Sequence, residues 1–195
     1  LRSIARRDGW LVMNDPFDFR SQFLDPDVQQ RVSEYRRAHD TRPLHVDLDV
    51  TTECNYRCSH CGDLARDQLN HGGLGAEILL ALVKDMGAIG VREVSLIGGG
   101  EPTASPHFRL LIDALHEQET RVGVVTNGSL IDHFMATEIA RTCSRIRVTL
   151  DAATSETYAA LHRPTNGISF DTVLKNTANL AKLMPGRVGV SYLVI

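Results

Sequence analysis

The sequence predicts an α/β protein built on a partial (β/α) barrel. Segments with the two-residue alternation of β-strands are followed by amphipathic helical segments, and this order repeats along residues 44–195. Strands separated by helices of this length pair in parallel, and right-handed crossovers place the helices outside the sheet. Glycine-rich and polar residues follow successive strands, which is where parallel barrels carry their chemistry. We therefore expect a barrel that is cut short after its fifth strand.

Each element is expected from a local pattern. Residues 44–50 alternate in polarity, whereas residues 76–89 form an amphipathic helix with the apolar residues Ile78, Leu79, Leu82, Val83, Met86 and Ile89. Gly90 follows as a helix stop, and Ser105-Pro106 is a helix start. The expected strands cover residues 44–50, 93–97, 121–125, 145–151 and 187–195, and the expected helices cover residues 27–39, 76–89, 105–115, 134–139, 155–161 and 169–184.

Two regions are expected, with a boundary before the first barrel strand. Residues 44–195 form the core, and residues 1–43 form an N-terminal extension with one helix. In that helix Val28, Val32 and Tyr35 make a narrow apolar stripe, which suits packing; substrate recognition is the alternative. The chain begins with Leu1 and ends in an apolar, strand-like run, so we expect it to be part of a longer polypeptide.

Composition limits the class of protein. The 195 residues suffice for one sizeable core, and 43% hydrophobic and 23% charged residues are ordinary for a globular chain. A net charge of −3 argues against a nucleic-acid partner, which a basic surface would attract. No apolar run approaches the ~20 residues of a membrane span, and the N-terminus lacks a signal-peptide pattern. We expect a cytoplasmic protein with no membrane partner.

The most informative stretch is a loop with three of the four cysteines, Cys54, Cys58 and Cys61, in a C-x3-C-x2-C spacing. It directly follows the strand expected at residues 44–50. Three thiolates in a tight loop leave one coordination position open, and sulfur ligands suit iron–sulfur clusters or zinc. A [4Fe–4S] cluster held at three irons would leave its fourth iron free for a small molecule.

Other interpretations of this loop stay open. A zinc ion could be held by the three cysteines with His45, His60 or His71 as the fourth ligand. A disulfide and a free thiol would require an oxidising compartment. Cys143 lies about eighty residues further along the chain and is interpreted as a small buried hydrophobic residue.

The loop resembles the signature of the radical S-adenosylmethionine (radical SAM) superfamily. The resemblance implies that Cys54, Cys58 and Cys61 bind a [4Fe–4S] cluster and that SAM chelates the open iron. It also implies reductive cleavage of SAM, after which the 5′-deoxyadenosyl radical removes a hydrogen atom from a substrate. His60 stands where the family often has an aromatic residue near the adenine. The competing hypothesis is a zinc- or cluster-binding structural module without turnover.

Three further strand ends are polar or rich in glycine. They are Gly98–Pro102, Thr126–Gly128 and Thr149–Asp151. Glycines let a ligand approach the backbone, and Glu101 can face an ammonium group. The plainer alternatives are a strand-to-helix turn at residues 98–100 and a common turn dipeptide at Asn127-Gly128.

The resemblance extends to these strand ends and spans roughly residues 44–195. Gly99-Gly100-Glu101-Pro102 is similar to the GGE motif, which holds the SAM amino group in the six-unit barrel of the family. Thr149-Leu150-Asp151 is similar to a strand end in the branch with molybdenum-cofactor synthases and SPASM/twitch-type peptide-modifying enzymes. The cofactor-binding residues implied are His60, Gly99, Gly100, Glu101, Thr126, Asn127, Thr149, Asp151 and Arg163.

The resemblance implies that Arg163 contacts the SAM carboxylate; the alternative is that Arg163 is a solvated loop residue. For the adjacent His162, the alternative to a ligand contact is a local hydrogen bond. The resemblance further implies a small-molecule or peptide substrate and an electron donor such as flavodoxin or ferredoxin. The substrate itself is not determined by the sequence.

Overall fold

The computed structural model describes residues 5–7, 10–12, 25–38, 42–61, 72–165 and 167–193. The chain divides into two compact units, Leu1–Leu44 and His45–Ile195. The first unit contains helix α2 (Pro26–Ala38) and an antiparallel pair of short strands, β1 (Ala5–Arg7) and β2 (Trp10–Val12). The helix matches the one expected at residues 27–39, of which His39 lies outside the described residues. The strand pair was not predicted, because three-residue strands show no clear alternation.

The second unit is an open parallel sheet with helices between its strands. Its strands β3 (His45–Leu48), β4 (Glu93–Leu96), β5 (Arg121–Thr126), β6 (Arg145–Thr149) and β7 (Val188–Ser191) pair in sequence order. The helices are α3 (Ala76–Ile89), α4 (Phe108–Glu117), α5 (His133–Thr142), α6 (Ser155–His162) and α7 (Phe170–Leu183). Among the described strands β3 and β7 each have one neighbour, so the predicted partial barrel is confirmed.

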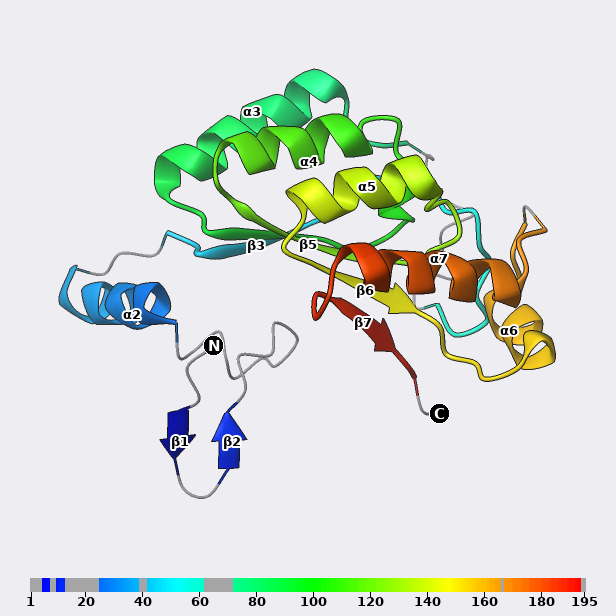
Figure 1. Ribbon diagram of the computed structural model, residues 1–195. Coiled ribbons are helices and arrows are strands. Elements are labelled where there is room, and N and C mark those ends of the chain that lie inside the picture. Colours follow the sequence, from blue (N-terminus) through cyan, green and yellow to red (C-terminus); the bar gives the residue numbers. More distant parts are fainter. Residues whose placement is uncertain are drawn as a thin grey trace. The chain divides into compact units, whose positions relative to one another are not determined.

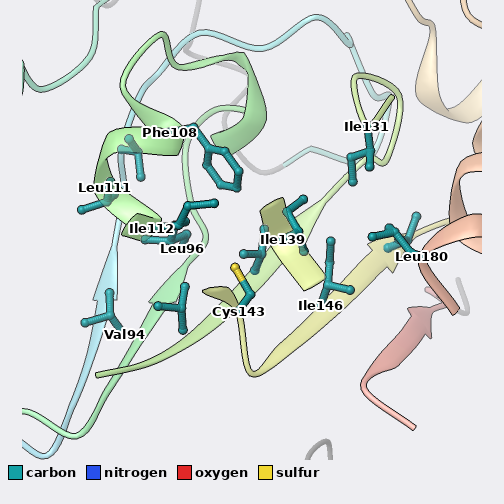
Figure 2. Packing of buried hydrophobic residues seen from close by; sticks show 14 of the residues in the cluster. Val94, Leu96, Phe108, Leu111, Ile112, Ile131, Ile139, Cys143, Ile146 and Leu180 are labelled. Carbon is teal, nitrogen blue, oxygen red and sulfur yellow. The ribbon is translucent and has the colours of Figure 1, made fainter. Parts of the chain in front are cut away.

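The helices α3, α4, α5 and α7 lie along one face of the sheet (Figure 1). Strand side chains alternate between faces, so every second residue points into this helix-covered layer. Figure 2 shows how the strand residues Val94, Leu96 and Ile146 pack there with Phe108 and Leu180 from the helices, all of them buried. Burial of this apolar layer holds the strands side by side and thereby brings their carboxyl ends together.

The opposite face of the sheet is polar. Arg145 and Arg121 both contact the carboxylate of Glu93, which is almost fully buried. His45 Nε2 lies 3.0 Å from the hydroxyl of Ser95, so this buried polar layer is satisfied by its own members.

Several boundaries differ from the expectation by a few residues, among them the start of α4 and the end of β7. A short 3₁₀ turn, η2 (Pro102–Ala104), precedes α4, and the helix begins at Phe108 instead of Ser105. The Ser105 hydroxyl accepts a hydrogen bond from the backbone N–H of His107, so this serine closes one turn before the helix begins. The last strand is shorter than residues 187–195, of which residues 194 and 195 lie outside the described part. In the described ranges, no helix is long and apolar enough to cross a membrane.

Cys143 is buried beside α5, as the sequence predicts, and burial raises the pKa of its thiol to about 12. Because the thiolate is the reactive form, we expect Cys143 to resist alkylation in the native cluster-free protein at pH 8 and to react after unfolding. Peptide mass spectrometry after iodoacetamide treatment measures this. Rapid native labelling of Cys143 would contradict the buried position, and Cys143→Ala should leave the iron content unchanged.

Candidate cofactor site

The cysteine loop follows β3 and is held in place by the end of α6. The backbone N–H of Ser59 donates to the carbonyl of Leu161 at 2.8 Å, and the N–H of Arg57 contacts the carbonyls of His162 and Arg163. The ring of Tyr56 is 1% exposed, and its hydroxyl lies 2.8 Å from that of Tyr158. An apolar anchor and backbone hydrogen bonds therefore fix the loop that presents the cysteines.

The glycine-rich loop after β4 packs directly on the cysteine loop. The N–H of Glu101 donates to the carbonyl of Glu53 at 2.8 Å. A Cβ atom at Gly100 would lie 2.3 Å from the carbonyl oxygens of both Thr51 and Glu53. Gly98 has φ of +141° and stands over Asp49, whose carboxylate accepts the N–H of Gly99. Glycine is thus required here by the close approach of two backbones.

The carboxylate of Glu101 ties the ends of β4 and β5 together. It is 3% exposed and accepts the hydroxyl of Thr126 at 2.6 Å and the backbone N–H of Asn127 at 2.7 Å. The N–H and hydroxyl of Thr103 also donate to it. Burial raises the pKa of Glu101, and these hydrogen bonds oppose that rise.

Asparagine side chains extend this network to the cysteine loop. Asn127 donates from Nδ2 to Oδ1 of Asn55 at 2.9 Å, and its own Oδ1 accepts the N–H of Ser129. Asn55 in turn donates to the Ser129 hydroxyl at 2.8 Å. The amide of Asn127 is therefore used to position the residue that follows Cys54.

The end of β6 carries Asp151, a buried residue with φ of +45°. One carboxylate oxygen accepts the backbone N–H of Leu193, and the other lies 3.2 Å from Nε2 of His60. Nδ1 of the buried His162 lies 3.3 Å from the sulfur of Cys58, and its Nε2 contacts the carbonyl of Leu150. Burial lowers the pKa of His162.

The Cys58 thiol is half-buried. Burial, followed by the charges of Cys54 and Cys61, raises its pKa to about 11. Any metal that binds it must displace its proton.

These elements line an open cavity of about 210 Å³. Its wall brings together most of the residues that the resemblance implies. It also contains apolar side chains and two aromatic rings that the sequence analysis did not assign to the site. The predicted residues on its wall are Cys54, Cys58, Cys61, His60, Gly100, Glu101, Thr126, Asn127 and Thr149; the additions are Tyr56, Ile97, Gly98, Val125 and His162.

Three expected residues do not line this cavity. Gly99 binds Asp49 through its backbone, and Asp151 touches the site through His60. Arg163 is exposed and ends α6 in a left-handed conformation with φ of +47°. The added Ile97 and Val125 were detectable in principle, since each is the last residue of an expected strand.

A model of the radical SAM superfamily matches residues 48–195. Mycofactocin maturase MftC of Mycobacterium tuberculosis is 31% identical over 169 residues, covering 86% of this chain and 41% of that protein. Fe-coproporphyrin III synthase of Methanosarcina barkeri is 34% identical over 113 residues, covering 57% of this chain and 28% of that protein. The chain therefore spans less than half the length of these curated relatives.

Solved structures share the fold. Streptococcus suis SuiB bound to precursor peptide SuiA superposes with a TM-score of 0.67 and 18% identity, covering 85% of this chain and 36% of SuiB. The protein anSMEcpe with bound AdoMet gives a TM-score of 0.63 and 21% identity, covering 77% of this chain and 43% of the other. At this identity the likeness shows a common fold.

Gly100→Ala tests the contact between the two loops. Because the added methyl group meets two backbone carbonyls, we expect a loss of ~1–3 kcal/mol in unfolding free energy, the usual cost of overpacking, and a lower iron content after reconstitution. Gly72→Ala is the control, since its Cβ meets no atom within 4 Å. Urea unfolding and iron analysis measure both; equal stability of the two variants would contradict the close contact.

Proposed function

The chain belongs to the radical SAM superfamily, and we propose that it is the core of an enzyme that binds a [4Fe–4S] cluster and cleaves SAM. The cluster ligands are Cys54, Cys58 and Cys61. The observation that supports this most directly is the meeting of the cysteine loop and the glycine-rich loop at a single cavity, which all three cysteines line.

The arrangement of the sulfur atoms favours a cluster over one zinc ion held by all three cysteines. Among the described residues, the three thiols do not form a group whose sulfurs converge on a single ion. A cluster bonds each thiolate to a different iron atom, so its ligands stand apart. The donor set therefore fits a cluster with one open iron.

When bound, the reduced cluster would supply the electron that cleaves SAM, and SAM would supply the radical that attacks the substrate. The protein binds, orients and excludes water around them. Glu101 suits the SAM ammonium group, because its Oε2 receives one hydrogen bond, from Asn127, and keeps an acceptor position. We assign Gly100 to the same contact and Gly99 to the turn that positions Gly100, since the N–H of Gly99 is bonded to Asp49. Thr126, Asn127 and Thr149 are assigned to the cavity wall around the remaining SAM atoms.

His60 is assigned to the cavity wall, and Asp151 acts through it. The contact between His60 Nε2 and the Asp151 carboxylate fixes the ring, which we propose lies near the adenine. Arg163 is left out of the SAM contacts, because its side chain is exposed and outside the cavity wall.

A peptide is the substrate class that we favour. SuiB, a structural neighbour, was solved with its precursor peptide, and it shares the fold over 85% of this chain. The one-electron chemistry requires a donor such as flavodoxin or ferredoxin. We propose a cytoplasmic location, since an oxygen-sensitive cluster persists best in a reducing compartment.

Reductive SAM cleavage tests the proposal. With anaerobically reconstituted protein, dithionite and SAM, we expect 5′-deoxyadenosine and methionine, measured by liquid chromatography and mass spectrometry. The triple variant Cys54→Ala, Cys58→Ala, Cys61→Ala should lose the cluster and the product, while Cys143→Ala keeps both. A fully loaded cluster that yields no 5′-deoxyadenosine, even with candidate peptides, would favour a structural module without turnover.

Glu101→Gln tests the ammonium contact. A hydrogen bond to a charged group contributes ~1.5–3 kcal/mol, so SAM affinity should fall roughly ten- to a hundredfold. The cluster should persist, because Glu101 is not a ligand. Arg163→Ala is the control and should bind SAM with an affinity close to that of the wild type. Calorimetric titration of reconstituted protein measures both, and wild-type affinity in Glu101→Gln would remove the assigned contact.

A further inference from the structure

Two histidine rings flank the sulfur of Cys58. His60 comes from the cysteine loop and His162 from the last turn of α6, and their ring centroids are 5.5 Å apart at an interplanar angle of 81°. The sulfur of Cys58 and one nitrogen from each ring all lie within 4.8 Å of one another. Among the described residues, these three form the one group of at least three cysteine, histidine or acidic side chains whose ligand atoms lie close enough together to hold a metal ion.

The outer side of each ring is held by an oxygen from the end of β6. Nε2 of His162 lies 3.0 Å from the carbonyl of Leu150, and Nε2 of His60 lies 3.2 Å from the carboxylate of Asp151. A carbonyl and an ionised carboxylate can only accept, so each Nε2 carries the proton and each Nδ1 of a neutral ring keeps a lone pair. Histidines that bind metals are typically oriented by such outer contacts.

The Nδ1 atoms of the two rings lack comparable partners. Among the described residues, Nδ1 of His60 is the buried side-chain nitrogen or oxygen atom with no hydrogen-bond partner. Nδ1 of His162 faces only the thiol of Cys58, at 3.3 Å. An unsatisfied buried nitrogen is costly, so a ligand that accepts its lone pair stabilises the site.

We propose that the cluster-free protein binds one divalent transition-metal ion, of the zinc or ferrous class, through Cys58 Sγ, His60 Nδ1 and His162 Nδ1. Two imidazoles and a thiolate suit such borderline ions. The distance of 3.3 Å between Cys58 Sγ and His162 Nδ1 is close to the edge of a tetrahedron with a Zn–S bond of ~2.3 Å and a Zn–N bond of ~2.0 Å. Binding releases the proton of Cys58 to solvent, and no electron is transferred.

Because Cys58 is shared, this single ion and the cluster exclude one another. The site gives the protein a metal-bound, cluster-free state that must be vacated before SAM chemistry begins. It is independent of whether SAM is cleaved, since it requires neither SAM nor Cys54 and Cys61.

Cobalt titration tests the site. The double variant Cys54→Ser, Cys61→Ser removes two cluster ligands and keeps the proposed three. In anaerobic, chelator-treated protein we expect this variant to bind one Co²⁺ per chain. Its absorption spectrum should show the visible bands of tetrahedral cobalt and a charge-transfer band from one thiolate, and Zn²⁺ should displace the cobalt. No tetrahedral cobalt spectrum in this variant, with its fold intact by circular dichroism, would overturn the proposal.

Histidine variants show whether the rings are ligands. His162→Gln and His60→Gln place an amide near the Nε2 position, so the contacts to Leu150 and Asp151 persist while the inner nitrogen is lost. Each should weaken cobalt binding by more than about tenfold, since even outer contacts contribute ten- to a hundredfold. His116→Gln, on the exposed side of α4, is the control. Unchanged affinity in both ring variants would show that cysteines alone hold the ion and overturn the assignment.

Discussion

The buried carboxylate of Glu101 is the interaction on which the site depends. A charge in an apolar interior is costly unless donors surround it, and four donors from Thr103, Thr126 and Asn127 meet this one. Its backbone N–H is bonded to Glu53 in the cysteine loop. The residue therefore joins three segments that are distant in sequence, and it lines the same cavity as the cysteines.

The two faces of the sheet explain why this site can form at the strand ends. One face is sealed by helices over residues such as Val94 and Ile146, and it supplies the apolar burial that keeps the strands in register. The other face carries Glu93 and Arg145, whose charges satisfy each other. The sheet and its helices thus supply most of the apolar burial, and the residues of the loops can serve the cavity.

The two proposed modes of metal binding share one ligand, Cys58, and therefore compete. Among the described residues, the three cysteines are not a group whose ligand atoms all lie within 4.8 Å of one another, whereas Cys58, His60 and His162 are. The ring of His162 belongs to the helix end that anchors the cysteine loop, so the same packing that orders the loop places an imidazole against Cys58. If both proposals hold, the cluster and the single ion compete for Cys58, so the order of assembly matters as well as the identity of the ligands.

The sequence by itself determined the βα order, the parallel sheet and the cysteine and glycine loops, because strand alternation, helical periodicity and ligand spacing are local properties. It did not reveal the short pair β1–β2, nor that η2 precedes α4, where Ser105 bonds its own turn. Only the tertiary structure decided that Asn55 and Asn127 meet, that Nδ1 of His162 lies beside the sulfur of Cys58 and that Arg163 is exposed and does not line the cavity. Such contacts join residues up to about a hundred positions apart, and their geometry is set by how α6 and the strand ends pack, which no local pattern encodes.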